Sequence, residues 1–129
     1  MADRFLVGGT GTSTDTAHWS ATSGGAGGQT VPGSGDAAII DALSGGGTYT
    51  IAGGPTFGSL SIVNINKTDA VSLSGNLTIT ANGALSLTGL TDINRLLMKS
   101  SILGTPRTIT ISGTTVPTLT SLDTQDITA

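Results

Sequence analysis

The chain of 129 residues contains no cysteine, so neither a disulfide framework nor a thiolate metal site is available to it. It also lacks glutamate: all eight acids are aspartate, and only five lysines and arginines accompany them. Because it is poor in Glu and Lys and holds twenty glycines, the chain lacks the residues that build surface helices. Thr, Ser, Val and Ile supply the bulk instead, which favours extended structure.

Basic residues are too few and too scattered for a nucleic-acid partner. The net charge is −3, whereas binding to nucleic acid depends on clustered Lys and Arg. The basic residues stand singly along the chain: Arg4, Lys67, Arg95, Lys99 and Arg107. The sequence therefore predicts no DNA or RNA partner.

Long apolar runs are absent as well. No stretch approaches the roughly 20 apolar residues that a membrane-spanning helix needs, so no membrane partner is expected. The opening MADRFLVGGTGT has no basic segment followed by a long apolar one, which predicts that there is no cleaved secretion signal.

What the chain does have, from Thr48 onward, is a regular alternation of apolar and hydroxyl residues. Alternation with period two is typical of half-buried strands. The runs cover residues 48–52, 59–63, 70–74, 77–80, 84–88, 96–100, 108–112 and 119–123. Gly, Asn, Pro or Asp separate them, as turns require. Only residues 91–100 also fit a helical turn.

Regular short strands allow two all-β architectures. In a β-sandwich or jelly roll each run pairs antiparallel with another. In a short parallel β-solenoid (β-helix), two or three strands make one coil and the coils stack. Short uniform strands, outward Ser and Thr, and only one Trp, one Tyr and two Phe favour the solenoid, because sandwich cores commonly contain more aromatics.

The chain is predicted to form a single domain with two regions. Residues 1–36 are dense in turn formers and are expected to form a Gly-rich N-terminal arm or cap, with Trp19 as its only large anchor. Residues 37–129 are the strand-repeat body. At about 20 to 25 residues per coil, this body makes roughly four coils.

No residue pattern predicts catalysis, a metal site or a cofactor. His18 is the only histidine and is assigned a structural role. Asp36 and Asp41 point to opposite faces if they lie on one strand, and Asp36 follows Gly-Ser-Gly, where an Asp typically caps a turn. Asp123 and Asp126 are expected to be solvated.

The opening VGGTGTSTDTAHWSATSGGAGGQTVPGSGDAAIID (7–41) resembles the start of Gly/Thr/Ser-rich β-solenoid proteins of tailed bacteriophages and of bacterial adhesin passengers. Residues 100–112 and 119–129 are similar to successive coils of such proteins. The residues of the opening that carry the resemblance are His18, Trp19, Ser20, Pro32, Gly33, Asp36, Ile39, Ile40 and Asp41.

The resemblance implies a non-enzymatic virion protein that assembles in the host cytoplasm. The virion protein is favoured over an adhesin, because adhesin passengers need a secretion signal and none is expected here. We expect a capsid decoration (cement) protein, a homotrimer that bridges subunits of the major capsid protein. The residues expected to dock on a partner are Trp19, His18, Gly24, Gly25, Gly27 and Gly28. The alternative is a tail-fibre or adhesin-type module that binds a glycan or receptor, with exposed Trp19, Tyr49 and Phe57 as platforms for sugars.

Overall fold

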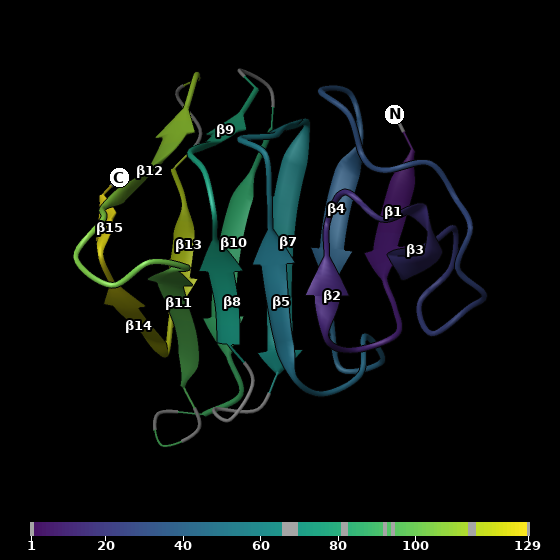
Figure 1. Ribbon diagram of the computed structural model, residues 1–129, viewed down its shortest axis with the longest axis horizontal. Helices are drawn as coiled ribbons and strands as arrows, with labels where there is room; N and C mark the ends of the chain where they lie inside the picture. The colour runs from purple at the N-terminus through teal and green to yellow at the C-terminus, as the bar shows by residue number, and fades with distance from the viewer. Residues whose placement is uncertain are drawn as a thin grey trace.

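The computed structural model describes residues 2–65, 70–80, 83–91, 93, 95–113 and 116–128. The fold is all-β with mostly parallel sheets, as predicted. Within the described residues the only helix is a short 3-10 helix (Thr16–His18). Figure 1 shows the strands side by side along the long axis, from the N-terminal end at the right to the C-terminal end at the left.

The strands form three sheets. The six-stranded sheet contains, in spatial order, β13 (Thr118–Thr120), β10 (Leu85–Gly89), β7 (Ser59–Ile65), β4 (Ala37–Ile40), β1 (Asp3–Leu6) and β3 (Trp19–Ser20). The five-stranded sheet contains β14 (Leu122–Gln125), β11 (Leu96–Ser100), β8 (Ala70–Leu73), β5 (Thr48–Ile51) and β2 (Gly11–Thr12). The four-stranded sheet contains β15 (Ile127–Thr128), β12 (Arg107–Ile111), β9 (Leu77–Ile79) and β6 (Thr56–Phe57).

From β4 onward, the chain visits the three sheets in turn, so each strand pairs in parallel with the third strand after it. Ala37 pairs with Ser59 and Thr48 with Ala70, in both cases 22 residues further along. The antiparallel pairing that a sandwich or jelly roll requires is found, in the described part of the chain, only between β1 and β3. Residues 96–100 form a strand and not a helical turn.

The core consists of inward side chains stacked from strand to strand. Ile62 on β7 lies in register between Ile40 on β4 and Leu87 on β10. Val71 on β8 lies in the same way between Tyr49 and Met98. All six are buried, and burying an apolar side chain of the size of Val, Leu, Ile or Met stabilises the fold by about 1.5–3 kcal/mol.

Glycines occupy the corner where the four-stranded sheet turns into the six-stranded one. Gly58 and Gly83 stand at this corner in successive layers, with Gly35 next to them. A Cβ on Gly83 would lie 1.5 Å from the carbonyl oxygen of Gly58, so only glycine fits there. The neighbouring layers can approach this closely because the corner carries no side chain.

The first 36 residues are built into the same sheets. Strand β1 pairs in parallel with β4, and β2 pairs with β5. The predicted arm is therefore joined to the body through β1 and β2, while residues 21–36 contain no strand. In Figure 1 this N-terminal segment lies at the right-hand end of the stack.

Candidate functional site

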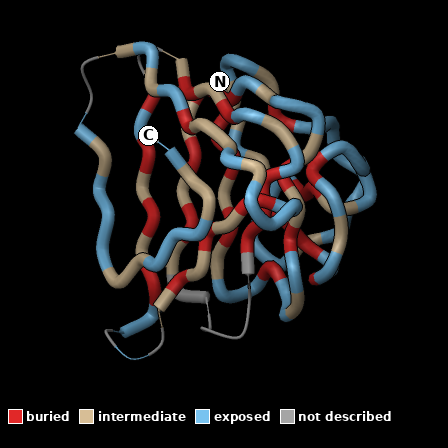
Figure 2. Tube along the Cα trace, turned by 60° about the vertical axis from the view of Figure 1, so that its left-hand side comes forward, coloured by how far each residue is buried: buried red, intermediate tan, exposed pale blue. Residues whose placement is uncertain are grey.

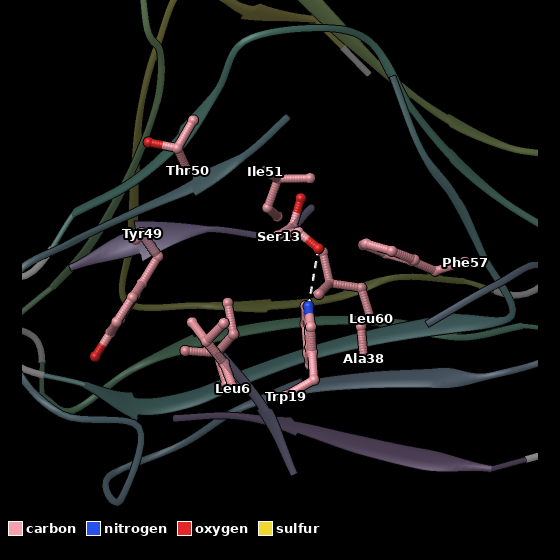
Figure 3. Close-up of a pocket in the computed structure, with 11 residues that line it drawn as sticks. Leu6, Ser13, Trp19, Ala38, Tyr49, Thr50, Ile51, Phe57 and Leu60 are labelled. Atoms are coloured by element: carbon pink, nitrogen blue, oxygen red, sulfur yellow. Dashed lines mark hydrogen bonds between the residues drawn. The ribbon is translucent and has the colours of Figure 1, made fainter. Parts of the chain in front are cut away.

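Trp19, expected on a docking surface, is a core residue. Its side chain is only 2% exposed, and its indole Nε1 donates a hydrogen bond of 2.8 Å to the carbonyl oxygen of Ser13. Figure 3 shows the ring close to Leu6 and Ala38. Trp19 is therefore not exposed in this structure: the largest apolar side chain of the N-terminal segment fills the end of the core, and its docking on a partner stays a prediction.

His18 makes local contacts that fit the structural role assigned to it, and its docking on a partner stays a prediction. Its Nδ1 lies 2.7 Å from the carbonyl oxygen of Val7, and its Nε2 lies 4.0 Å from a carboxylate oxygen of Asp15. The ring packs on Gly11, where a Cβ would come within 2.3 Å of Nε2. The imidazole thus fixes the first turn of the chain.

The glycines at 24–28 fold back onto the N-terminal region. Gly28 donates its N–H to the carbonyl oxygen of Thr16, and Gly25 donates to Thr22. A Cβ on Gly27 would lie 1.9 Å from the carbonyl oxygen of Ala17. Gly24, Gly27 and Gly28 are exposed and Gly25 is half-buried, and their role in binding a partner stays a prediction.

The aromatic platforms of the glycan-binding alternative are buried. Tyr49 is 1% exposed and Phe57 is 2% exposed, and Trp19 is enclosed with them. The interior that these rings share leaves a cavity of only about 10 Å³, near the lower limit for a single water molecule. The expectation of exposed sugar platforms is therefore wrong.

Asp36 caps a turn, as predicted. Its carboxylate accepts hydrogen bonds from the backbone N–H groups of Gly33 (2.9 Å) and Ala2 (3.1 Å). The hydrogen bond from Gly33 and then that from Ala2 lower the pKa of Asp36 below its usual 3.8, since both stabilise the charged form. The cap thus ties the start of the chain to the turn that precedes β4.

Asp123 is exposed, as expected, and Asp126 is half-buried; both also have partners. Arg95 Nε lies 2.8 Å from Asp123 Oδ1, and Asp126 accepts a 2.8 Å hydrogen bond from the N–H of Gly104. The sequence could have indicated the Arg95–Asp123 pair only through the strand register. Arg95 directly precedes β11, and Asp123 lies on β14 opposite Leu97 of β11.

The described residues hold no group of three or more His or Asp side chains that could bind a metal ion. Among those residues there is also no helix with the length and apolar character needed to cross a membrane. A groove of about 340 Å³ follows the glycine corner. Its lining offers hydroxyl and backbone groups but no charged or aromatic side chain: Ser34, Gly35, Gly58, Ser59, Thr80, Gly83 and Ala84.

The two ends of the stack differ in how their strand edges are covered. At the N-terminal end, the backbone of residues 15–33 bonds two edge strands: Asp15 donates its N–H to Thr12 on β2, and Gln29 donates to Trp19 on β3. Gly58, between β6 and β7, donates its N–H to the carbonyl oxygen of Gly33. At the C-terminal end the last strands are β13, β14 and β15. No described strand lies beyond them, so these edges are candidates for pairing with another chain.

The C-terminal end is also apolar. An open depression of about 80 Å³ lies between the last strands. Its lining comes from all three sheets: Leu85, Leu87, Met98, Ile109, Ile111, Pro117, Leu119, Leu122, Thr124 and Ile127. In Figure 2, which brings this end forward, the strands nearest the C-terminus are mostly exposed, while those further along the stack are largely buried.

Exposed hydrophobic side chains gather in the same part of the chain. Of the eight large ones that are exposed in the described residues, six lie between residues 90 and 119, so the apolar surface is concentrated in the C-terminal part. These six are Leu90, Ile93, Ile102, Leu103, Val116 and Leu119. We take the open C-terminal end, defined by β13, β14, β15 and the apolar depression, as the candidate functional site.

No protein-family model, curated protein or solved structure matches this chain.

Proposed function

We propose that the chain is a short parallel β-solenoid that serves as a non-enzymatic structural protein of a tailed-bacteriophage virion, specifically a capsid decoration (cement) protein. The observation that carries the proposal is the contrast between the ends: one is closed around Trp19, and the other presents an apolar depression with three strand edges. Such a body is suited to joining protein surfaces.

The strand order supports the solenoid. From β4 onward the strands fall into four triplets, β4–β6, β7–β9, β10–β12 and β13–β15, with one strand of each triplet in each sheet. This agrees with the four coils expected from the sequence. At a spacing of about 4.8 Å between strands, four coils form a body about 20 Å tall, which suits a capsid surface better than a long fibre.

The roles of the aspartates support a non-enzymatic function. Asp36 caps a turn, Asp123 pairs with Arg95, and Asp126 accepts the N–H of Gly104. Asp41 accepts the N–H of Leu43 and the hydroxyl of Ser23. Each of these carboxylates thus has a local structural partner.

The surface chemistry supports a cementing role. Outward positions on the strands are largely Ser and Thr, which can pack against another protein without the desolvation cost of burying charge. In this proposal the protein assembles onto the shell in the host cytoplasm and bridges subunits of the major capsid protein. The glycan-binding alternative is less well supported, because three of the four aromatic rings are buried.

Quantitative mass spectrometry of purified particles encoded by the same genome tests the proposal. We expect the protein in a fixed ratio to the major capsid protein, and particles that lack it should release their DNA at a lower temperature. Absence of the protein from purified particles would contradict the proposal. The homotrimer expected from the sequence is a separate alternative: a molar mass of three chains in solution would support it and would contradict the dimer argued below.

A further inference from the structure

We propose that the open C-terminal end binds a second copy of this chain, end to end, about a two-fold axis. The inference rests on the proposed solenoid and names the partner at its open end. Two copies joined in this way form an elongated dimer with an N-terminal segment at each outer end.

The apolar lining gives the first reason for a protein partner. Leu119 on β13 is 55% exposed, and it lines the depression together with the partly buried Leu122 and Ile127. In the preceding coil the equivalent position, Leu87, is 2% exposed, and Leu119 pairs with it in register. The last coil therefore lacks the cover that each earlier coil receives from the next.

The strand edges give the second reason. Strands β13, β14 and β15 each end their sheet, so a partner that continues all three sheets must itself present three strand edges. The C-terminal end of another copy presents such a set. A two-fold axis through β14 pairs β14 with itself in antiparallel orientation, and it brings β13 of each copy to β15 of the other.

Head-to-tail stacking is less favourable, because residues 15–33 already bond part of the N-terminal end. Gln29 donates its N–H to the carbonyl oxygen of Trp19 on β3, and Asp15 donates to that of Thr12 on β2. The proposed contact therefore uses the C-terminal end of both copies, which makes the interface isologous and the assembly a closed dimer.

Charge selects the register between the two β14 strands. Leu122 and Thr124 line the depression, and side chains alternate along a strand, so Asp123 and Gln125 face outward. Two alignments of β14 with β14 of the other copy keep the inward residues Leu122 and Thr124 opposite inward residues. One places Asp123 opposite Asp123 of the other copy, and like charges directly opposite are destabilising.

The other register places Thr124 on the axis and Asp123 opposite Gln125 of the other copy. In this arrangement each Asp123 keeps its own Arg95, 2.8 Å away, and no like charges face each other across β14. The end is thus complementary to itself in charge as well as in strand geometry.

Light scattering on a sizing column tests the dimer directly. We expect a mass of twice the 12.7 kDa of the chain. Leu119→Asp should reduce the mass to that of one chain, because it places a carboxylate at the apolar contact, with an unchanged circular dichroism spectrum. Leu43→Asp is the matched control, since Leu43 is 63% exposed in the N-terminal half, and this variant should remain a dimer.

Cysteine cross-linking tests the register, and the absence of native cysteine keeps the background clean. Directly opposite residues of antiparallel strands have Cα atoms about 4.5–5.5 Å apart, within the range of a disulfide. Thr124→Cys should therefore form a covalent dimer on mild oxidation. Thr12→Cys is the control, because Thr12 is exposed on β2, the opposite edge strand of the same sheet, and it should not.

The outcomes separate this inference from the proposed function. A monomeric wild type, or an assembly unaffected by Leu119→Asp, overturns the end-to-end dimer even if the protein is found in virions. Cross-linking of Thr12→Cys with an efficiency equal to that of Thr124→Cys overturns it as well. A dimer with the expected variant behaviour, combined with absence from particles, supports the interface and overturns the virion role.

Discussion

Trp19 combines two stabilising contributions in one side chain, a buried indole ring and a hydrogen bond from Nε1 to Ser13. We predict that Trp19→Ala lowers the free energy of unfolding by about 3–5 kcal/mol, the usual cost of truncating a buried aromatic. Urea unfolding followed by circular dichroism measures the change. Leu43→Ala is the control, because Leu43 is 63% exposed, and it should change the value by less than about 0.5 kcal/mol.

A loss below about 1 kcal/mol for Trp19→Ala would show that the cap contributes little to the fold. Because Trp19 is the largest side chain that packs at the closed end, such a result would also weaken the contrast between the two ends on which the proposed function depends.

Asp36 makes the stability depend on pH in a defined direction. Its native pKa lies below 3.8 because Gly33 and Ala2 donate to the carboxylate, so the native state binds its proton less readily than the unfolded chain does. The stabilising contribution is present in full above the unfolded value and is lost as the pH falls from about 3.8 through the lowered native pKa.

We therefore predict that Asp36→Asn is less stable than wild type at pH 7 and that the difference shrinks below about pH 3.8. Denaturant unfolding across this range measures it. Asp3→Asn provides a comparison, because Asp3 is an exposed residue. A difference for Asp36→Asn that stays constant down to pH 2 would contradict the assigned cause.

At the scale of the element, the corner between the four-stranded and six-stranded sheets sets how closely the layers stack. We predict that Gly83→Ala destabilises the fold at the upper end of the roughly 1–3 kcal/mol typical of overpacking, because its Cβ would lie 1.5 Å from the oxygen of Gly58. The midpoint of thermal unfolding measures this. Gly35→Ala is the matched control at the same corner, since a Cβ there meets nothing within 4 Å.

Equal losses for the two alanine variants would contradict a specific contact at position 83, because Gly→Ala without a steric conflict is expected to stabilise slightly by reducing the entropy of the unfolded chain.

The sequence predicted where the strands lie better than it predicted which residues lie next to each other across strands. Alternation indicates a strand at 96–100 whichever strand it pairs with, and this was confirmed because the side-chain period depends only on the local backbone. The ion pair between Arg95 and Asp123 joins residues 28 positions apart, and no local pattern encodes such a register. Trp19 was misplaced for a similar reason: a Gly-rich surrounding indicates a loop but does not show on which side of it the core lies.

At the scale of the whole molecule, stability should vary along the stack, because each coil is stabilised mainly by its neighbours. The middle strands β7 and β8 have partners on both sides, whereas β13, β14 and β15 have described partners on one side. The last coil is also the most exposed part of the strand-repeat body. Local opening should therefore begin at the C-terminal end, since regions with few buried contacts open at the lowest free energy.

We predict that backbone amides of β13–β15 exchange with deuterium first and those of β7 and β8 last, as followed by mass spectrometry of peptides. The proposed dimer adds a second expectation: protection of β13–β15 should increase with protein concentration in the wild type but not in Leu119→Asp, because only association covers these edges. Amides of β1 and β3 at the closed end provide the internal control and should exchange at the same rate at every concentration. Uniform exchange along the stack would contradict an end-dependent stability, and concentration-independent exchange of β14 would contradict its pairing with a second copy.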